Sequence, residues 1–124
     1  MRDVFHEQLD AVFVDLAAIC GQVETAVCEA TKSLLEADVE VAEQVISADV
    51  DIDRARVEVE EQCFELLSLQ QPVAGDLRVV VAALRMVTEL ERMGDLSVHV
   101  AKIARMRVPD VAVPAEIKPT VARM

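Results

Sequence analysis

The sequence predicts an all-α protein, an elongated antiparallel bundle of three long helices. Hydrophobic residues make up 53 % of the 124 residues, a content too high for a disordered chain. Only three Gly and four Pro are present, too few for the many turns of an all-β domain. Apolar residues recur in steps of three and four along three segments, as they do on one face of an α-helix.

The first predicted helix begins near the N-terminus and ends near Glu36. Its apolar residues keep a heptad pattern for about four repeats, and they are Phe5, Leu9, Val12, Leu16, Ile19, Val23, Ala26, Ala30 and Leu34. Asp38 is a typical N-cap residue, and Glu40 in the following turn has the charge that a helix N-terminus favours. The next helix is therefore expected to begin at Asp38.

The second and third predicted helices each carry one apolar stripe. The second stripe consists of Val45, Ala48, Ile52, Ala55, Val59, Leu66 and Leu69, with Cys63 beside it. It ends at Gln71-Pro72, because the residue before a proline avoids the α region. The third stripe consists of Leu77, Val80, Leu84, Val87, Gly94, Val98 and Ala101. Pro109 ends the third helix. Short connections make consecutive helices antiparallel neighbours, so residues 1–107 are assigned to the bundle and 108–124 to a linker with at most a helix start.

Charge and composition exclude several classes of protein. A formal net charge of −11 argues against a nucleic-acid partner, which needs clustered Lys and Arg. The longest uninterrupted apolar run is Val79–Leu84, far short of the roughly 20 residues of a membrane span. Acidic residues in the N-terminal segment exclude a signal peptide. Cys20, Cys28 and Cys63 have no C-x-x-C spacing and are expected to be small buried residues in a reducing cytoplasm.

Two pairs of acidic residues have the i, i+4 spacing that directs both carboxylates to one side of a helix. Asp49 and Asp53 lie on the second helix, and Glu91 and Asp95 on the third. In an antiparallel pair that turns at Pro72, residues at equal height have numbers that sum to about 144. Asp53 then faces the level of Glu91, and Asp49 that of Asp95. Two carboxylates about 5 Å apart repel by roughly 3 kcal/mol at an effective dielectric constant near 20, so four need cations or protonation.

These carboxylates predict a metal site, because oxygen ligands from facing helices suit Mg, Mn, Fe or Zn. His99, one turn beyond Asp95, is a candidate further ligand. The spacing leaves an alternative open, in which Arg54, Arg56 and Arg92 neutralise the acids in a solvated ion-pair network. Phosphate itself is not expected to bind, because the chain has no glycine-rich loop or basic cluster to hold it.

Two segments carry a resemblance to a known family. Residues 71–78 read QPVAGDLR, and residues 89–95 read ELERMGD. In this order they resemble one repeat, the N-terminal one, of the PhoU family, and the resemblance covers about residues 1–107. Members of that family resemble two tandem three-helix bundles, so this chain has one repeat and, after Pro114, at most the opening turn of a second.

The resemblance also implies site residues. Its E(D)xxxD motifs, which bind metal clusters in some members, correspond here to Asp49 with Asp53 and to Glu91 with Asp95. A family Asn near the end of the third helix corresponds to His99, which leaves the identity of the metal open.

The resemblance implies a negative regulator of phosphate uptake and of phosphate-starvation signalling, an adaptor with no catalysis of its own. Its partners would be the ATPase of a phosphate ABC transporter and a sensor histidine kinase, and it would be cytoplasmic, reaching the inner membrane only through them. A homodimer would rebuild the double bundle, and a truncated chain is the other explanation for a single repeat. Two other functions are alternatives: a structural helical oligomerisation module without metal, and a di-metal carboxylate enzyme. The enzyme is disfavoured because no Glu is followed three residues later by His.

Overall fold

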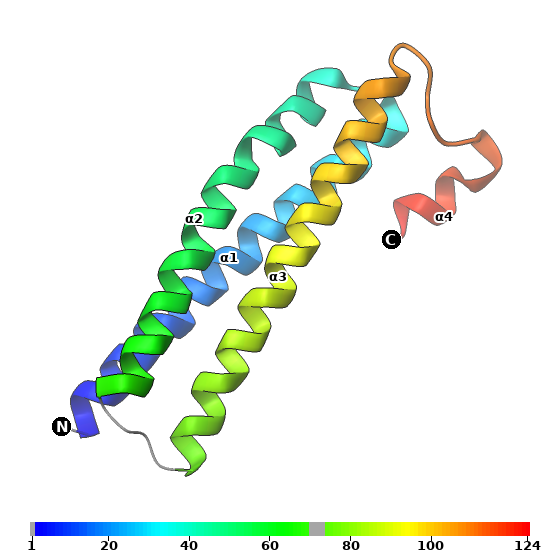
Figure 1. Cartoon of the computed structure of the whole chain (residues 1–124). Coiled ribbons are helices and arrows are strands. Elements are labelled where there is room, and N and C mark those ends of the chain that lie inside the picture. The colour runs from blue at the N-terminus through cyan, green and yellow to red at the C-terminus, as the bar shows by residue number, and fades with distance from the viewer. Residues whose placement is uncertain (1, 70–73) are drawn as a thin grey trace. The chain divides into compact units, whose positions relative to one another are not determined.

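A computed structural model of the chain describes residues 2–69 and 74–124, with the side chains of 4–68 and 74–124. Three long helices, α1 (Arg2–Glu36), α2 (Val39–Leu69) and α3 (Ala74–Arg107), precede a short 3-10 turn η1 (Ala115–Ile117) and a short helix α4 (Lys118–Ala122) (Figure 1). The described residues contain no strand, which confirms the all-α class.

The three long helices match the predicted ones closely, since α1 ends at Glu36 and α3 ends before Pro109. The predicted turn at Gln71-Pro72 lies outside the described residues. The tail at 108–124 contains η1 and α4, more helix than the single helix start that was expected.

The chain divides into two compact units, and each long helix contributes a segment to both. Unit 1 consists of Met1–Gln22 and Asp51–Glu91, and unit 2 of Val23–Val50 and Arg92–Met124. The elongated antiparallel bundle and the division of the chain at residue 107 stay predictions.

In unit 2 the end of α1 and the start of α2 are fixed by local hydrogen bonds. Ala37 adopts a left-handed conformation with φ 53°, and the N–H of Asp38 donates to the carbonyl of Ser33 at 3.1 Å. This is the Schellman arrangement that closes a helix C-terminus. The Asp38 carboxylate then accepts the N–H of Val41 at 3.2 Å, which confirms the predicted N-cap of α2.

Each unit has its own apolar core. The core of unit 1 contains Phe5, Leu9, Val12, Leu16, Ile19, Ile52, Val59, Cys63, Leu66, Val80, Ala83 and Val87. The core of unit 2 contains Val23, Ala26, Ala30, Ala42, Val45, Val98, Ala101, Ala104 and Val113. Most of these residues belong to the predicted stripes, so helical periodicity located most of the core on all three helices. Leu77 of the predicted third stripe is an exception, because it is 41 % exposed at the start of α3.

The predicted stripe of α2 is wrong at one position, because Ala48 is exposed. Between the buried residues Val45 and Ile52, a core-facing residue at position 48 or at position 49 would keep the helical spacing of three and four residues. In the structure Asp49 is the half-buried one. The core-facing line of α2 continues from Ile52 through Arg56 to Val59, so two ionisable residues occupy positions that an apolar side chain usually fills.

The three thiols differ in their surroundings. Cys63 is fully buried, whereas Cys20 and Cys28 are exposed, so the prediction that all three are buried is wrong for the two on α1. Burial raises the pKa of the Cys63 thiol, and the nearby negative charge of Glu60 adds to the rise.

By length and apolar composition alone, the segment Val4–Glu36 of α1 could cross a membrane, although the sequence analysis expects no span. This is weak evidence, because the core helix of a soluble protein passes the same test. In this chain α1 supplies Val12 and Ile19 to the core of unit 1 and Val23 to that of unit 2. About 28 % of the apolar window is buried, so core packing accounts for part of its apolar character.

Candidate functional site

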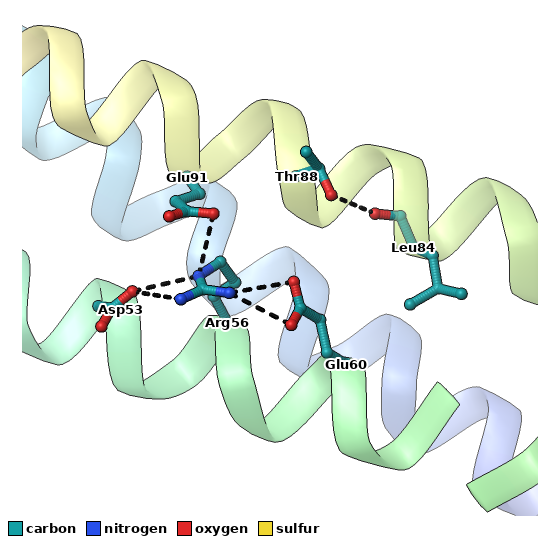
Figure 2. Close-up of polar contacts among 6 residues, drawn as sticks. All are labelled: Asp53, Arg56, Glu60, Leu84, Thr88 and Glu91. Atoms are coloured by element: carbon teal, nitrogen blue, oxygen red, sulfur yellow. Dashed lines mark hydrogen bonds and ion pairs between the residues drawn. The ribbon is translucent and has the colours of Figure 1, made fainter. Parts of the chain in front are cut away.

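Among the side chains of unit 1 that the structure describes, the guanidinium of Arg56 on α2 forms the most ion pairs (Figure 2). Its side chain is 19 % exposed because it lies on the core-facing line of the helix. Glu91, one turn beyond the buried Val87 on α3, is 34 % exposed. The side chains of Arg56 and Glu91 therefore meet at the edge of the core.

Arg56 contacts three carboxylates, two from its own helix and one from α3. Its Nη2 lies 2.6 Å and its Nε 3.2 Å from Asp53 Oδ1. Its Nη1 donates to both oxygens of Glu60, at 3.1 and 3.2 Å. Its Nε also lies 3.1 Å from Glu91 Oε2. Figure 2 shows the guanidinium lying among the three carboxylates, so one cation joins α2 to α3.

The electrostatics of this cluster favour the charged guanidinium. The hydrogen bond to Asp53 makes the largest contribution and raises the pKa of Arg56. The hydrogen bond to Glu60 and the negative charges of Glu91 and Asp53 raise it further, against the opposing effect of burial. Three carboxylates around one guanidinium leave an excess of negative charge, which Arg56 reduces but does not cancel.

The predicted metal ligands are divided between the two units. Asp53 and Glu91 belong to unit 1, where both contact Arg56. Asp49, Asp95 and His99 belong to unit 2; Asp49 is half-buried, and the other two are exposed.

In this arrangement one oxygen of Asp53 and one oxygen of Glu91 contact the Arg56 guanidinium, so a metal ion at this pair would compete with that cation. Among residues 2–69 and 74–124, no group of three or more His, Cys, Asp or Glu side chains is placed to hold a metal ion. The metal site built from all five residues stays a prediction.

Of the three arginines in the ion-pair alternative, Arg56 pairs with two of the site carboxylates, and Arg54 pairs with an acid outside the site. Arg54 Nη1 lies 3.6 Å from Asp51 Oδ1 on the exposed side of α2. Arg92 is exposed and forms no ion pair with any residue that the structure describes. The sequence analysis missed Glu60, although its i, i+4 spacing from Arg56 is a recognisable signal for a helical ion pair.

Other polar contacts tie α1 to the remaining helices of unit 1. His6 Nε2 lies 3.5 Å from Asp76 Oδ1 at the start of α3. Gln62 Nε2 donates to Asp15 Oδ2 at 3.1 Å, which connects α2 to α1. Together with the Arg56–Glu91 pair, these contacts link each of the three helical segments of unit 1 to the other two.

An apolar groove between α1 and α3 is a second feature that the sequence analysis missed. It belongs to unit 1 and has a volume of about 560 Å³. Its lining residues are Phe13, Leu16, Ala17, Cys20, Met86 and Leu90, with Arg85 and Glu89 as the charged members. Phe13 and Met86 are 40 % and 53 % exposed. The groove could therefore accept an apolar side chain or a helix face from another protein.

The comparisons with known proteins agree on one family. A family model described as "PhoU domain" matches residues 16–104. The phosphate-specific transport system accessory protein PhoU homolog 2 of Mycobacterium bovis is 48 % identical over all 124 residues, and the match covers 58 % of that protein. PhoU homolog 1 of Mycobacterium leprae is 46 % identical over 94 % of this chain and 53 % of its own length.

A more distant relative is the accessory protein PhoU homolog of Aquifex aeolicus. It is 42 % identical over 66 % of this chain, and the match covers 37 % of that protein. The chain thus spans a little more than half the length of the mycobacterial relatives it matches. No solved structure matches the chain.

Proposed function

This chain belongs to the PhoU family, and we propose that it is a negative regulator of phosphate uptake and of phosphate-starvation signalling. The observation that carries this proposal is its 48 % identity, over its whole length, to a protein named as an accessory protein of a phosphate-specific transport system. An accessory protein of a transporter acts by contacting other proteins. The proposed function is therefore that of an adaptor without catalysis.

The proposed partners are the ATPase of a phosphate ABC transporter and a sensor histidine kinase. The apolar groove of unit 1 supports a contact of this kind, because partly exposed apolar side chains such as Phe13 and Met86 can take up a helix face. The adaptor would be cytoplasmic and would reach the membrane only through its partners.

Co-purification with the transporter ATPase and with the sensor kinase of the same organism tests the proposal. Met86→Glu places a charge on the wall of the groove and is expected to abolish retention of at least one partner and to derepress phosphate-starvation genes. Phe64→Glu is the matched control, because Phe64 is 57 % exposed on α2 of the same unit and does not line the groove. Equal retention by wild type and Met86→Glu would contradict a role for the groove, and failure of the wild type to bind either partner would contradict the adaptor.

The structural oligomerisation module remains the alternative function, and the same co-purification separates it from the adaptor. A homodimer is also proposed as the working state, since two copies would supply two three-helix repeats. Light scattering behind size-exclusion chromatography measures the mass directly. A monomer at micromolar concentration would contradict the dimer.

The metal site of Asp49, Asp53, Glu91, Asp95 and His99 stays a prediction. Carboxylate oxygens and a neutral imidazole suit Mn, Fe or Zn. Metal content after growth in supplemented medium, together with thermal stability in the presence and absence of a chelator, tests it. Purified protein that contains no metal and whose Tm the chelator does not change would remove this part of the proposal.

A further inference from the structure

We propose that the guanidinium of Arg56 is the resident cation of the Asp53–Glu91 carboxylate pair and occupies the place that a metal ion would need. The inference concerns the chemistry of unit 1 and does not depend on transporter regulation. It departs from the metal site predicted from the sequence, because it gives two of the predicted ligands to a side chain of the protein itself.

The contacts of Arg56 use every nitrogen of the guanidinium. Nε and Nη2 reach Asp53, Nε also reaches Glu91, and Nη1 takes both oxygens of Glu60. A divalent metal ion needs carboxylate oxygens at roughly 2.0–2.6 Å. The guanidinium lies among these three carboxylates (Figure 2), so a metal ion cannot collect the same oxygens until Arg56 leaves.

A comparison with the neighbouring Arg54 shows that this arrangement is not an ordinary surface ion pair. Arg54 and Asp51 are 68 % and 65 % exposed and lie 3.6 Å apart within one helix. Arg56 is much less exposed, contacts three acids, and joins two helices. Its position on the core-facing line of α2, between Ile52 and Val59, directs the side chain toward the edge of the core.

A covalently attached cation competes strongly with a free one. Arginine is charged at every accessible pH, and attachment to the same helix holds it near the carboxylates at an effective concentration of millimolar or more. A free metal ion must displace it from Asp53 and Glu91 and leave a partly buried guanidinium with Glu60 as its remaining partner, which is costly. The apparent affinity of the Asp53–Glu91 pair for metal is therefore expected to be low while Arg56 is present.

Equilibrium dialysis with Mn²⁺ tests the inference on the full chain. Arg56→Met removes the charge and keeps an unbranched apolar stem, and Arg54→Met is the matched control on the same helix. We expect Arg56→Met to bind one further Mn²⁺, or to bind it roughly tenfold or more tightly than wild type. Arg54→Met should behave as wild type. Adding Glu91→Gln to Arg56→Met should abolish the gain, which assigns the ion to this pair.

Arg56→Lys is a second variant that keeps the test valid where Arg56→Met does not fold, because lysine keeps the charge but loses the planar fork. It should bind Mn²⁺ more tightly than wild type and less tightly than Arg56→Met. Circular dichroism confirms that each variant is helical. Equal Mn²⁺ affinity in wild type and the folded Arg56 variants, including no binding by any of them, would overturn the inference. Wild-type binding that Glu91→Gln alone abolishes would also overturn it, because a metal ion would then be the resident cation.

These outcomes are independent of the proposed function. Equal Mn²⁺ affinity in wild type and the Arg56 variants would not change the result of the partner co-purification. Failure of the co-purification would not change the result of the dialysis.

Discussion

The ion pair between Arg56 and Glu91 is predicted to couple α2 to α3 more strongly than a surface pair couples two residues of one helix. The perturbation is a double-mutant cycle of Arg56→Met and Glu91→Gln. Both substitutions remove a charge and keep the approximate length of the side chain. The reference cycle uses Arg54→Met and Asp51→Asn, since that pair is exposed and lies within α2.

The expected magnitude follows from distance and burial. A hydrogen bond to a charged group contributes about 1.5–3 kcal/mol when well shielded, and an exposed ion pair about 0.2–1 kcal/mol. Arg56 is largely buried, but Glu91 is one-third exposed and their atoms lie 3.1 Å apart. We therefore expect a coupling free energy of about 1–1.5 kcal/mol, between the exposed range and the shielded range. The Arg54–Asp51 pair, at 3.6 Å, should give about 0–0.5 kcal/mol.

Removal of Arg56 alone should cost more than the coupling to Glu91. The single Arg56→Met variant leaves three carboxylates close together without their cation, so its free energy of unfolding should fall by about 2 kcal/mol. Adding Glu91→Gln to Arg56→Met should restore part of the lost free energy of unfolding, because it relieves the repulsion among these carboxylates.

Urea unfolding, followed by circular dichroism at 0.1 M and 1 M NaCl, measures both cycles. The Debye length falls from about 10 Å to about 3 Å over this range, so the reference coupling should vanish while at least about half of the Arg56–Glu91 coupling persists. Couplings of the two pairs that agree within about 0.3 kcal/mol would refute the reasoning. That result would mean that water solvates Arg56 as fully as Arg54.

The remaining predictions concern packing, backbone conformation and thiol chemistry. Leu66→Ala removes a fully buried side chain from unit 1 and should lower the free energy of unfolding by about 2–5 kcal/mol, whereas Phe64→Ala at an exposed position should lower it by less than about 1 kcal/mol; urea midpoints compare the two. Ala37→Gly should raise stability by about 0.5–1 kcal/mol, because glycine adopts the φ of 53° without steric cost, and an unchanged or lowered Tm would contradict this. Cys20 is exposed and should react with iodoacetamide in the native protein, whereas Cys63 should react only after unfolding, because it is buried and its pKa is raised; mass spectrometry of peptides measures both. Because the pKa of Cys63 is raised in the folded state, its contribution to the free energy of unfolding is fully present below the ordinary thiol pKa and is lost as pH rises through the folded-state pKa. Stability should therefore fall at alkaline pH, and Cys63→Ala should make this fall smaller.

Local sequence signals predicted the helices well. Helical spacing located most of the apolar faces of α1 and α3, while Asp38 and Pro109 located where these two helices end. Asp38 also caps the first turn of α2, as predicted. These features depend on residues within a few positions of one another, so the order of amino acids is enough to predict them. The residues at Gln71-Pro72 provided an equally local signal, but they lie outside the described residues.

The same signals could not choose between Ala48 and Asp49 on the core-facing side of α2. Helical spacing allows both, and an apolar residue is the usual choice for a core line. The structure instead makes Asp49 half-buried and leaves Ala48 exposed. Ala48 was predicted because core positions of a helix are usually apolar. That rule describes an average, and it fails where a polar residue has partners.

The sequence by itself determined that this chain forms three long helices and carries the PhoU motifs, because periodicity, capping and motif order are properties of neighbouring residues. Only the tertiary structure decided which cation serves Asp53 and Glu91. Spacing within a helix makes carboxylates neighbours, but the identity of their partner depends on the side chain that the packing of α2 against α3 directs between them. In unit 1 that side chain is Arg56, which the core-facing line of α2 places among Asp53, Glu60 and Glu91.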